Sequence, residues 1–403
     1  MPTLEAFAGL RYDATRVRLD DVIAPPYDVI TSNERQRLAS RHRANAVLVE
    51  LPEADLMGRR DRYAVAADLL AGWRATGVLA LDPRPSLYPY RMTSPDGRRS
   101  TGVIGALRLP EAGQDDVLPH EQTLAKPRSD RLDLLRATAT NLSPIWGLSL
   151  ARGLSAAIDL DGRTPTADAH DDQGVRHQLW VLEDPDLVAT IGGVIEQAPI
   201  VIADGHHRYQ TAIAYQQERR ASSSGAPGLY DLVMALVMEL SEEEVHVEAI
   251  HRTLSGPAPL DVPGTFGRWF DVIRAGPATP RTVGALVDAG SMALVTPDEA
   301  YLLQANPDAF DAAGSDLDAS LVELVLGDLE GYEATHRHTW QEAAAAVAGG
   351  TAQAALLLRP VRVTQIAEWA TTGRRMPPKT TYFSPKPRTG LVFRPLDLGP
   401  VGS

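Results

Sequence analysis

The segment from Ala198 to Gln217, APIVIADGHHRYQTAIAYQQ, constrains the fold more than any other part of the chain. Its apolar run, Ile200 to Ala203, has the character of a buried strand. The run stops at Asp204-Gly205, and beyond it apolar residues return at helical spacing. The segment therefore predicts a strand, a tight turn and a helix, with Asp204 capping the helix N-terminus.

The predicted turn has the chemistry of an anion-binding site. Gly205 lets the backbone approach a ligand closely, and the unpaired amides of a helix N-terminus face whatever binds there. His206, His207 and Arg208 fall in the first helical turn, where positive side chains oppose the helix dipole. A bound phosphate would remove that unfavourable interaction, so the turn predicts a phosphate site.

Composition limits the chemistry and the partners of such a site. The chain has 403 residues, 44% of them hydrophobic and 23% charged, which is typical of a globular protein with two or three domains. A formal net charge of −13 argues against nucleic acid or an anionic membrane as the main partner, so small molecules are expected. Because the chain has no cysteine, thiolate catalysis, disulfides and cysteine-ligated metals are excluded.

Neither a targeting segment nor a membrane span is expected. The first residues, MPTLEAFAGLRYD, carry charges and lack the apolar core of a signal peptide. The longest apolar candidate, Leu229 to Leu240, is interrupted by Asp231 and Glu239. These features predict a soluble cytoplasmic protein, and they leave its oligomeric state open.

Helical and strand patterns alternate along the chain, which predicts a mixed α/β protein of the α+β class. The predicted helices span residues 32–40, 60–76, 132–142, 185–197, 282–288, 317–329, 339–348 and 363–372. The predicted strands include residues 46–51, a hairpin over 86–109, and residues 229–240, 292–295, 301–304 and 354–358.

Two polar segments that precede the turn are candidates for the rest of the site. In Val22 to Ile30, VIAPPYDVI, two prolines force an extended or turning backbone just before Tyr27 and Asp28. Asp28 is either an ordinary polar residue near a helix start or a carboxylate in the site, with Tyr27 as a substrate contact. The segment 119–131, PHEQTLAKPRSDR, is either a functional loop or a solvated charged turn. Its candidate residues are His120, Glu121, Lys126 and Arg131.

A third polar segment, MPPKTTYFSPKPRTGLVFRP, lies near the C-terminus at residues 376–395. Prolines stiffen it, and Lys379, Tyr382 and Lys386 are its candidate ligand contacts. A basic loop of this composition differs from a fraying terminus.

Common catalytic motifs are missing from the sequence. No GxxxxGK[ST], helix-opening GxGxxG, HExxH or GxSxG string occurs. Adjacent histidines on a helix point about 100° apart, so His206 and His207 are poorly placed to share one metal ion. Phosphoryl transfer, which needs cations, donors, magnesium and a carboxylate base, suits the remaining residues. The alternative is a structural network of hydrogen-bonded histidines.

The string IADGHHRYQTA resembles the strand, turn and helix signature of the ParB/sulfiredoxin-like superfamily, and its DGHHR form is similar to that of free L-serine kinases. Nearly the whole chain resembles a widespread bacterial and archaeal family of unknown function, through APPYDV, HE-x-T…K…DRL, ADGHHRY and PxKTTYFxPK. The resemblance implies a ParB-like nucleotide-binding region at 1–255, with an insertion at about 40–195. A C-terminal α/β lobe at 256–403 would carry the basic loop at 376–390.

The superfamily resemblance also implies roles for individual residues. Gly205, His206, His207 and Arg208 would contact nucleotide phosphates, and Asp204 would serve catalysis or bind Mg²⁺. Asp28 is the nearest match to the kinase base, although it is Asp rather than Glu, and Glu121 is the reserve. Apart from this resemblance, we expect Lys126, Arg131, Lys379 and Lys386 as further phosphate contacts, and Tyr27, His120 and Tyr382 as substrate contacts.

These residues predict a nucleotide-dependent phosphotransferase that uses ATP or ADP and acts on a small hydroxyl substrate, with free serine or a related hydroxy acid as the candidate. The first alternative is a nucleotide-binding switch that hydrolyses slowly or not at all. The second is a phosphatase that uses the same pocket.

Overall fold

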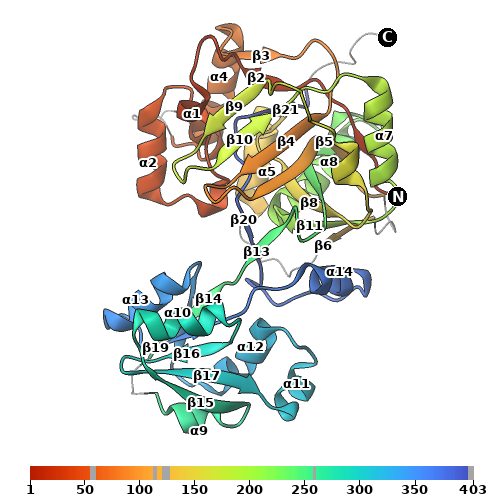
Figure 1. The fold of residues 1–403 in the computed structure, drawn as a ribbon. Coiled ribbons are helices and arrows are strands. Elements are labelled where there is room, and N and C mark those ends of the chain that lie inside the picture. Colours follow the sequence, from red (N-terminus) through yellow and green to blue (C-terminus); the bar gives the residue numbers. More distant parts are fainter. Residues whose placement is uncertain (55–59, 112–115, 120–127, 257–259, 398–403) are drawn as a thin grey trace. The chain divides into compact units, whose positions relative to one another are not determined.

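A computed structural model describes residues 1–54, 60–111, 116–119, 128–256 and 260–397. Contacts divide the chain into two compact units, the first comprising Met1–His246 and Pro385–Ser403, and the second Val247–Ser384. The chain therefore leaves the first unit after His246 and returns to it at Pro385, where the blue end of the ribbon rejoins the red-to-green part (Figure 1). This division differs from the expected boundary after residue 255, because the C-terminal segment packs with the N-terminal region.

The first unit is built on one large sheet. Its strands are β1 (Leu4–Glu5), β4 (Tyr88–Thr93), β5 (Arg99–Arg108), β6 (Val117–Pro119), β8 (Ile145–Ser149), β9 (Ala167–His170), β10 (Arg176–Leu179), β11 (Ile200–Asp204) and β12 (Leu232–Glu239). Within the described residues, the strand order is β6-β11-β8-β12-β5-β4-β10-β9, with β1 paired to β5. The pairs β6/β11 and β8/β12 are parallel, and the other neighbours are antiparallel.

Helices and short strands surround this sheet. The helices are α1 (Leu19–Val22), η1 (Tyr27–Val29), α2 (Ser32–Arg41), α3 (Val47–Glu50), α4 (Arg62–Ala75), α5 (Arg128–Thr138), α6 (Leu154–Ala157), α7 (Pro185–Ile195), α8 (His206–Ser222) and η2 (Leu229–Asp231). The short strands pair as β2 (Leu10–Tyr12) with β3 (Leu79–Leu81), and β7 (Thr140–Asn141) with β21 (Arg394–Pro395). The expected mixed α+β class is confirmed.

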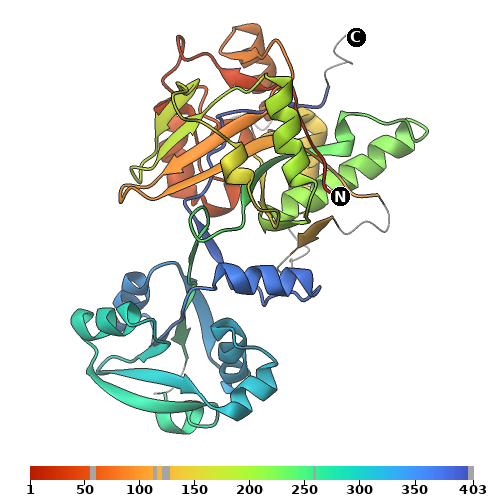
Figure 2. The same cartoon turned by 45° about the vertical axis from the view of Figure 1, so that its right-hand side comes forward.

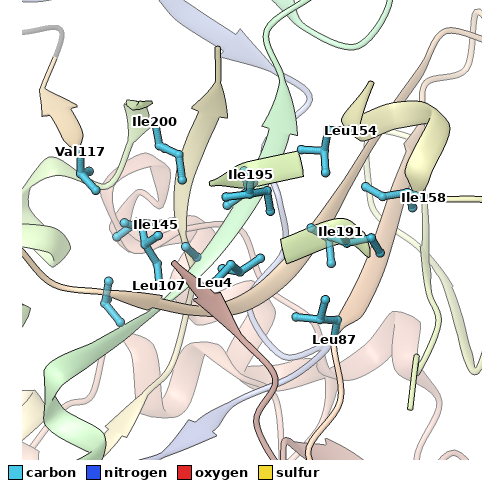
Figure 3. Packing of buried hydrophobic residues seen from close by; sticks show 14 of the residues in the cluster. Leu4, Leu87, Leu107, Val117, Ile145, Leu154, Ile158, Ile191, Ile195 and Ile200 are labelled. Carbon is cyan, nitrogen blue, oxygen red and sulfur yellow. The ribbon is translucent and has the colours of Figure 1, made fainter. Parts of the chain in front are cut away.

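A large apolar cluster packs the sheet against helices of the same unit. Ile191 and Ile195 of α7 meet Leu4 of β1 and Ile145 of β8 in this cluster, where Figure 3 shows their side chains gathered together. All four are at most 5% exposed. Burial of apolar area on this scale is the main favourable contribution to folding, so the strand that leads to Asp204 rests on a rigid base.

A second apolar cluster joins the N-terminal helices to the C-terminal segment. Phe393 is fully buried among Tyr12, Leu38 and Trp73. Backbone hydrogen bonds of 2.9 Å run in both directions between Leu10 and Phe393. The returning segment is thus part of the core of the first unit.

Two local expectations are wrong. The strand expected over residues 46–51 is the helix α3, because the Asn45 side chain accepts a hydrogen bond from the Val47 amide and bends the chain there. The helix expected over 132–142 begins at Arg128 and ends at Thr138. It ends because Ala139 has a left-handed φ of 42° and the next residues pair with β21.

Other local expectations are confirmed. The hairpin over 86–109 is β4 and β5, joined by Ser94 to Arg98. Helix α7 begins after Asp184, whose side chain accepts from the next amides, with Pro185 at its first position. The apolar run 229–240 forms η2 and the buried strand β12.

The second unit is a smaller mixed α/β unit. Its strands are β14 (His251–Ser255), β15 (Phe270–Pro277), β16 (Ala293–Val295), β17 (Glu299–Ala305), β18 (Glu333–Arg337), β19 (Ala354–Leu357) and β20 (Tyr382–Ser384), with β13 (His246–Glu248) at the division. Its helices are α9 (Val262–Phe266), α10 (Pro280–Asp288), α11 (Pro307–Ala313), α12 (Asp318–Asp328), α13 (Trp340–Ala348) and α14 (Val363–Thr371). The helices and strands expected in this region are confirmed, apart from small shifts of their ends.

Both faces of the sheet in the second unit are covered by helices. Within the described residues, its strand order is β15-β17-β16-β19-β14-β18. Leu294 of β16 enters an apolar cluster with α9 and α12, whereas its neighbours Ala293 and Val295 enter another with α10 and α13. Alternate residues of a strand point to opposite faces, so the unit has three layers, which can be followed in Figure 2.

None of the described helices has both the length and the apolar character needed to cross a membrane.

Arg394 tests the importance of the returning segment. It is 2% exposed, and it donates to Asn141 Oδ1 at 3.1 Å, to Leu232 O at 2.9 Å and to Leu229 O at 2.9 Å. Arg394→Met removes these three hydrogen bonds from a buried position, so we expect a loss of about 3 kcal/mol in the free energy of unfolding, measured by urea denaturation. Arg152→Met, at an exposed position, is the control and should change it by less than about 0.5 kcal/mol. Equal stability of both variants would contradict the prediction.

Candidate functional site

The predicted strand, turn and helix are present in the first unit. Strand β11 pairs with β8, and the register shifts between Ile202 and Asp204, an irregularity just before the strand ends. Gly205 follows with φ 85°, a left-handed conformation that favours glycine. Helix α8 then runs for 17 residues from His206. On its other side β11 runs parallel to β6, with Ile202 opposite Pro119.

The expected capping role of Asp204 is wrong. The residue at the N-cap position of α8 is Gly205, and no side chain caps the helix. Asp204 is the last residue of β11, and its carboxylate is held by two cations instead. The Asp204 side chain therefore does not cover the amides at the start of α8. The predicted phosphate site needs these amides to be available to the ligand.

The Asp204 carboxylate forms ion pairs with both a lysine and an arginine. Lys386 Nζ lies 2.7 Å from Oδ1, and Arg208 Nη2 lies 2.9 Å from Oδ2. The three side chains are 11% to 13% exposed. Burial alone would raise the pKa of Asp204, but Lys386 and Arg208 outweigh it and lower the pKa, so the carboxylate is charged at neutral pH. The cluster of Asp204, Arg208 and Lys386, here called the Asp204 cluster, carries one excess positive charge.

Arg208 connects the Asp204 cluster to neighbouring segments. Its Nη1 donates to the carbonyl of Pro144. Burial would lower its pKa, but the carboxylates of Asp204, Asp28 and Glu50 together raise it, so the guanidinium is charged. A Cβ placed on Gly205 would lie 3.1 Å from the guanidinium carbon, so only glycine fits here without displacing Arg208.

The early segment and the C-terminal segment meet beside this cluster. Ala24 and Thr389 exchange backbone hydrogen bonds of 3.0 and 2.8 Å, which ties the segment before Tyr27 to the segment that carries Lys386. Burial raises the pKa of Tyr27 to about 12, so its hydroxyl keeps its proton. Asp28 is exposed, and its charge acts on Arg208 and on Tyr27. Tyr27, Asp28 and Lys386, far apart in sequence, thus belong to one neighbourhood.

Arg131 belongs to the same neighbourhood. Its guanidinium lies 4.3 Å from the ring centroid of Tyr27, and its Nη1 donates to the carbonyl of Glu50 at 2.7 Å. Its Nε and Nη2 donate to Asp130 Oδ2 at 2.9 and 2.6 Å. With these contacts, Arg131 supports Tyr27 and Glu50; its predicted contact with phosphate stays a prediction.

Glu50 is a site residue that the sequence interpretation missed. It is 2% exposed, and its Oε1 accepts from Ser143 Oγ at 2.9 Å. Burial raises the pKa of Glu50, while Arg131 and Arg208 act in the opposite direction. One sequence feature points to Glu50: it follows the apolar run Val47 to Val49 directly, which indicates a buried position. A carboxylate that is buried needs specific polar partners, so such a residue is a candidate site residue.

Several predicted residues are not tested by this geometry. His120, Glu121 and Lys126 lie outside the described residues. Lys379 and Tyr382 belong to the second unit. There Lys379 has φ 59° and its carbonyl accepts from Arg252 Nη2 at 3.0 Å, and the rings of Tyr382 and His338 are 4.4 Å apart. His206 and His207 lie half-buried in the first turn of α8.

A buried hydrogen-bond network holds the segment that carries Lys386. The guanidinium of Arg388 contacts Asp171 Oδ2, and the same oxygen lies 3.0 Å from His177 Nε2. His177 Nδ1 lies 2.7 Å from the hydroxyl of Tyr90, which accepts from the Arg388 amide at 3.2 Å. Every member is at most 9% exposed, so the network fixes the backbone close to Lys386.

Metal binding by protein groups alone is not indicated within the described ranges. No group of three or more His, Cys, Asp or Glu side chains there has an arrangement that could hold a metal ion.

The fold and the turn define a mixed α+β protein with a charged cluster at the start of a helix. The chain belongs to the family described as protein of unknown function (DUF1015), whose model matches residues 4–320. The family membership expected from the motifs is confirmed. No curated protein matches the chain.

Solved structures with low similarity to the chain include a free serine kinase in complex with AMP, with a TM-score of 0.38 and 15% identity, covering 72% of this chain and 91% of that one. A conserved hypothetical protein from Pyrococcus furiosus has a TM-score of 0.36 and 14% identity, covering 72% and 93%. SbnI with a C-terminal truncation, from Staphylococcus aureus, has a TM-score of 0.39 and 12% identity, covering 73% and 87%.

Gly205→Ala tests the turn. The left-handed φ of 85° and the close guanidinium predict a loss of about 1 to 2 kcal/mol in the free energy of unfolding, with displacement of Arg208. Urea denaturation measures it. Gly193→Ala in α7 is the matched control, because a Cβ there meets nothing within 4 Å; it should stabilise by about 0.5 to 1 kcal/mol. The same sign for both variants would contradict the prediction.

Asp171→Asn tests the network behind Lys386. Burial would raise the pKa of Asp171, but His177 and Arg388 outweigh it and lower the pKa below its usual value. Its stabilisation is therefore complete above about pH 4 and is lost as the pH falls through the folded-state pKa. We expect the variant to lose about 3 kcal/mol at neutral pH, and the difference from the unmodified protein to narrow below about pH 4. Urea denaturation across this pH range measures the free energy of unfolding of both proteins. A difference between them that stays constant with pH would contradict the prediction.

Proposed function

We propose that the first unit is a nucleotide-dependent phosphotransferase that acts on a small hydroxyl compound. The observation that carries this proposal is the Asp204 cluster, in which two buried cations share one carboxylate beside the uncapped start of α8. An anion placed there would meet backbone amides, a helix dipole and the positive charges of Arg208 and Lys386.

The cluster has features that phosphoryl transfer needs. Arg208 and Lys386 gather at one carboxylate, Asp204, beside the start of α8. Phosphoryl transfer depends mainly on positioning and on charge stabilisation around the moving phosphoryl group, and His206 and His207 at the same turn add further donors.

The other parts of a transfer site have candidates in the same unit. Asp28 is an exposed carboxylate whose charge acts on Arg208. It is the candidate base within the described residues, and Glu121 remains the reserve. Tyr27, which keeps its proton, is the candidate substrate contact.

Magnesium fits this site as a companion of the nucleotide. Both oxygens of Asp204 already accept from cations, so Asp204 would supply at most one further contact to Mg²⁺. Mg²⁺ commonly binds through one or two carboxylates together with substrate phosphates, and there it would neutralise charge on those phosphates.

Phosphorus NMR tests the function directly. The protein is incubated with Mg²⁺, a pool of amino and hydroxy acids, and ATP, ADP, CTP or pyrophosphate in turn. A new phosphoester signal supports the phosphotransferase, whereas nucleotide binding without transfer supports the switch. Orthophosphate released from an added phosphoester supports the phosphatase, and no binding of any phosphate compound rejects all three.

Two variants locate the phosphate site. Lys386→Met and His207→Ala each remove a donor, so we expect the affinity for ADP, measured by calorimetry, to fall roughly tenfold or more. Gln217→Ala, at an exposed position of the same helix, is the control and should keep full affinity. Full affinity in both site variants would show that the nucleotide binds elsewhere.

A further inference from the structure

A small cavity lies beside the Asp204 cluster within the first unit. It has about 50 Å³ of space for water-sized molecules, and Arg208 lines it together with Glu50, Thr211 and Arg131. A single water molecule needs roughly 10 to 15 Å³ measured in this way, so the cavity has room for a group the size of a hydroxymethyl.

Three side chains that line the cavity have a buried polar atom without a partner. Within the described part of the chain, Glu50 Oε2, Arg208 Nε and Thr211 Oγ1 make no hydrogen bond. Glu50 is 2% exposed, Thr211 is 3% exposed, and the Arg208 side chain is 11% exposed. Buried polar groups are nearly always satisfied, so three such atoms around one cavity indicate a polar occupant.

The chemistry of these atoms selects the occupant. Arg208 Nε is a donor, Glu50 Oε2 is an acceptor when the carboxyl is ionised and can be a donor when it is protonated, and the Thr211 hydroxyl is either. A carboxylate or phosphate would be repelled by Glu50, and an ammonium group would be repelled by Arg208 and Arg131. A hydroxyl group both donates and accepts without carrying charge.

The remaining wall of the cavity has polar residues, Thr140, Asn141 and Ser143, and an apolar part. Leu134, Leu135, Leu142 and Val233 line it and would contact the carbon that bears such a hydroxyl. Arg208 joins the cavity to the proposed phosphate site, because it lines the cavity while its Nη2 donates to Asp204.

We propose that this cavity is the subsite for a hydroxyl group of the substrate, which donates to Glu50 Oε2 and accepts from Arg208 Nε or Thr211 Oγ1. The proposal rests on the proposed function, and it narrows the substrate to compounds with a hydroxymethyl or similar group. Glu50 and Thr211 become specificity residues, and a compound that lacks the hydroxyl leaves their polar atoms unsatisfied.

The test compares ligands that differ by one hydroxyl in the full-length protein. Calorimetry measures L-serine against L-alanine, and glycerate against lactate, without nucleotide. We expect the hydroxyl compound of at least one pair to bind about tenfold or more tightly. Thr211→Val should reduce that preference roughly threefold to tenfold, and Glu50→Gln should reduce it further, because a hydrogen bond to a charged group is stronger.

Thr211→Val separates recognition from folding. Because Oγ1 of Thr211 has no partner in the described structure, the variant should be at least as stable to urea as the unmodified protein. Thr138→Val is the control: its hydroxyl donates to Leu134 O at 2.8 Å and it is not among the lining residues, so it should lower stability and leave the preference unchanged.

Two results would overturn the proposal. One is the absence of any hydroxyl preference, with a crystal structure that shows water on Glu50. The other is an unchanged preference in both Thr211→Val and Glu50→Gln. A preference that depends on Thr211 without phosphoryl transfer would keep the subsite and reject the proposed function. Phosphoryl transfer by the protein, together with a hydroxyl preference that the variants leave unchanged, would keep the proposed function and reject the subsite.

Discussion

The contact between Asp204 and Lys386 is the interaction on which the site depends. It joins the end of strand β11 to a segment that returns from the far end of the chain, and Arg208 completes it from the first turn of α8. Without Asp204, two cations would remain buried without their shared carboxylate, which is among the costliest arrangements in a protein. The Asp204 side chain therefore links the strand, the helix and the returning segment at the site.

Local patterns were enough to predict much of the first unit. The strand, turn and helix around Gly205, the hairpin of β4 and β5, and the proline-started α7 follow from residues close in sequence. Such signals are strong because turn and cap residues act over a few positions. The prediction failed where a distant contact decides the outcome. Asp204 was expected to cap α8, but Lys386 and Arg208 occupy its oxygens instead.

Glu50 shows why the rest of the candidate site could not be predicted. Its apolar neighbours suggested a strand, whereas Asn45 bends this segment into α3. Only the folded chain brings Ser143, Arg131 and Arg208 around Glu50. Likewise, sequence alone does not show that the chain leaves the first unit at His246 and returns at Pro385, because the signals for that return are tertiary hydrogen bonds such as those of Arg394.

The return of the chain at Pro385 has a consequence for biosynthesis. A ribosome makes β11, the turn and α8 long before it makes Lys386, and the whole second unit is translated in the interval. N-terminal regions generally begin to fold during synthesis, so the nascent first unit holds Asp204 and Arg208 without their third partner. The Asp204 cluster is completed late in translation, and a polypeptide released before that point would lack Lys386.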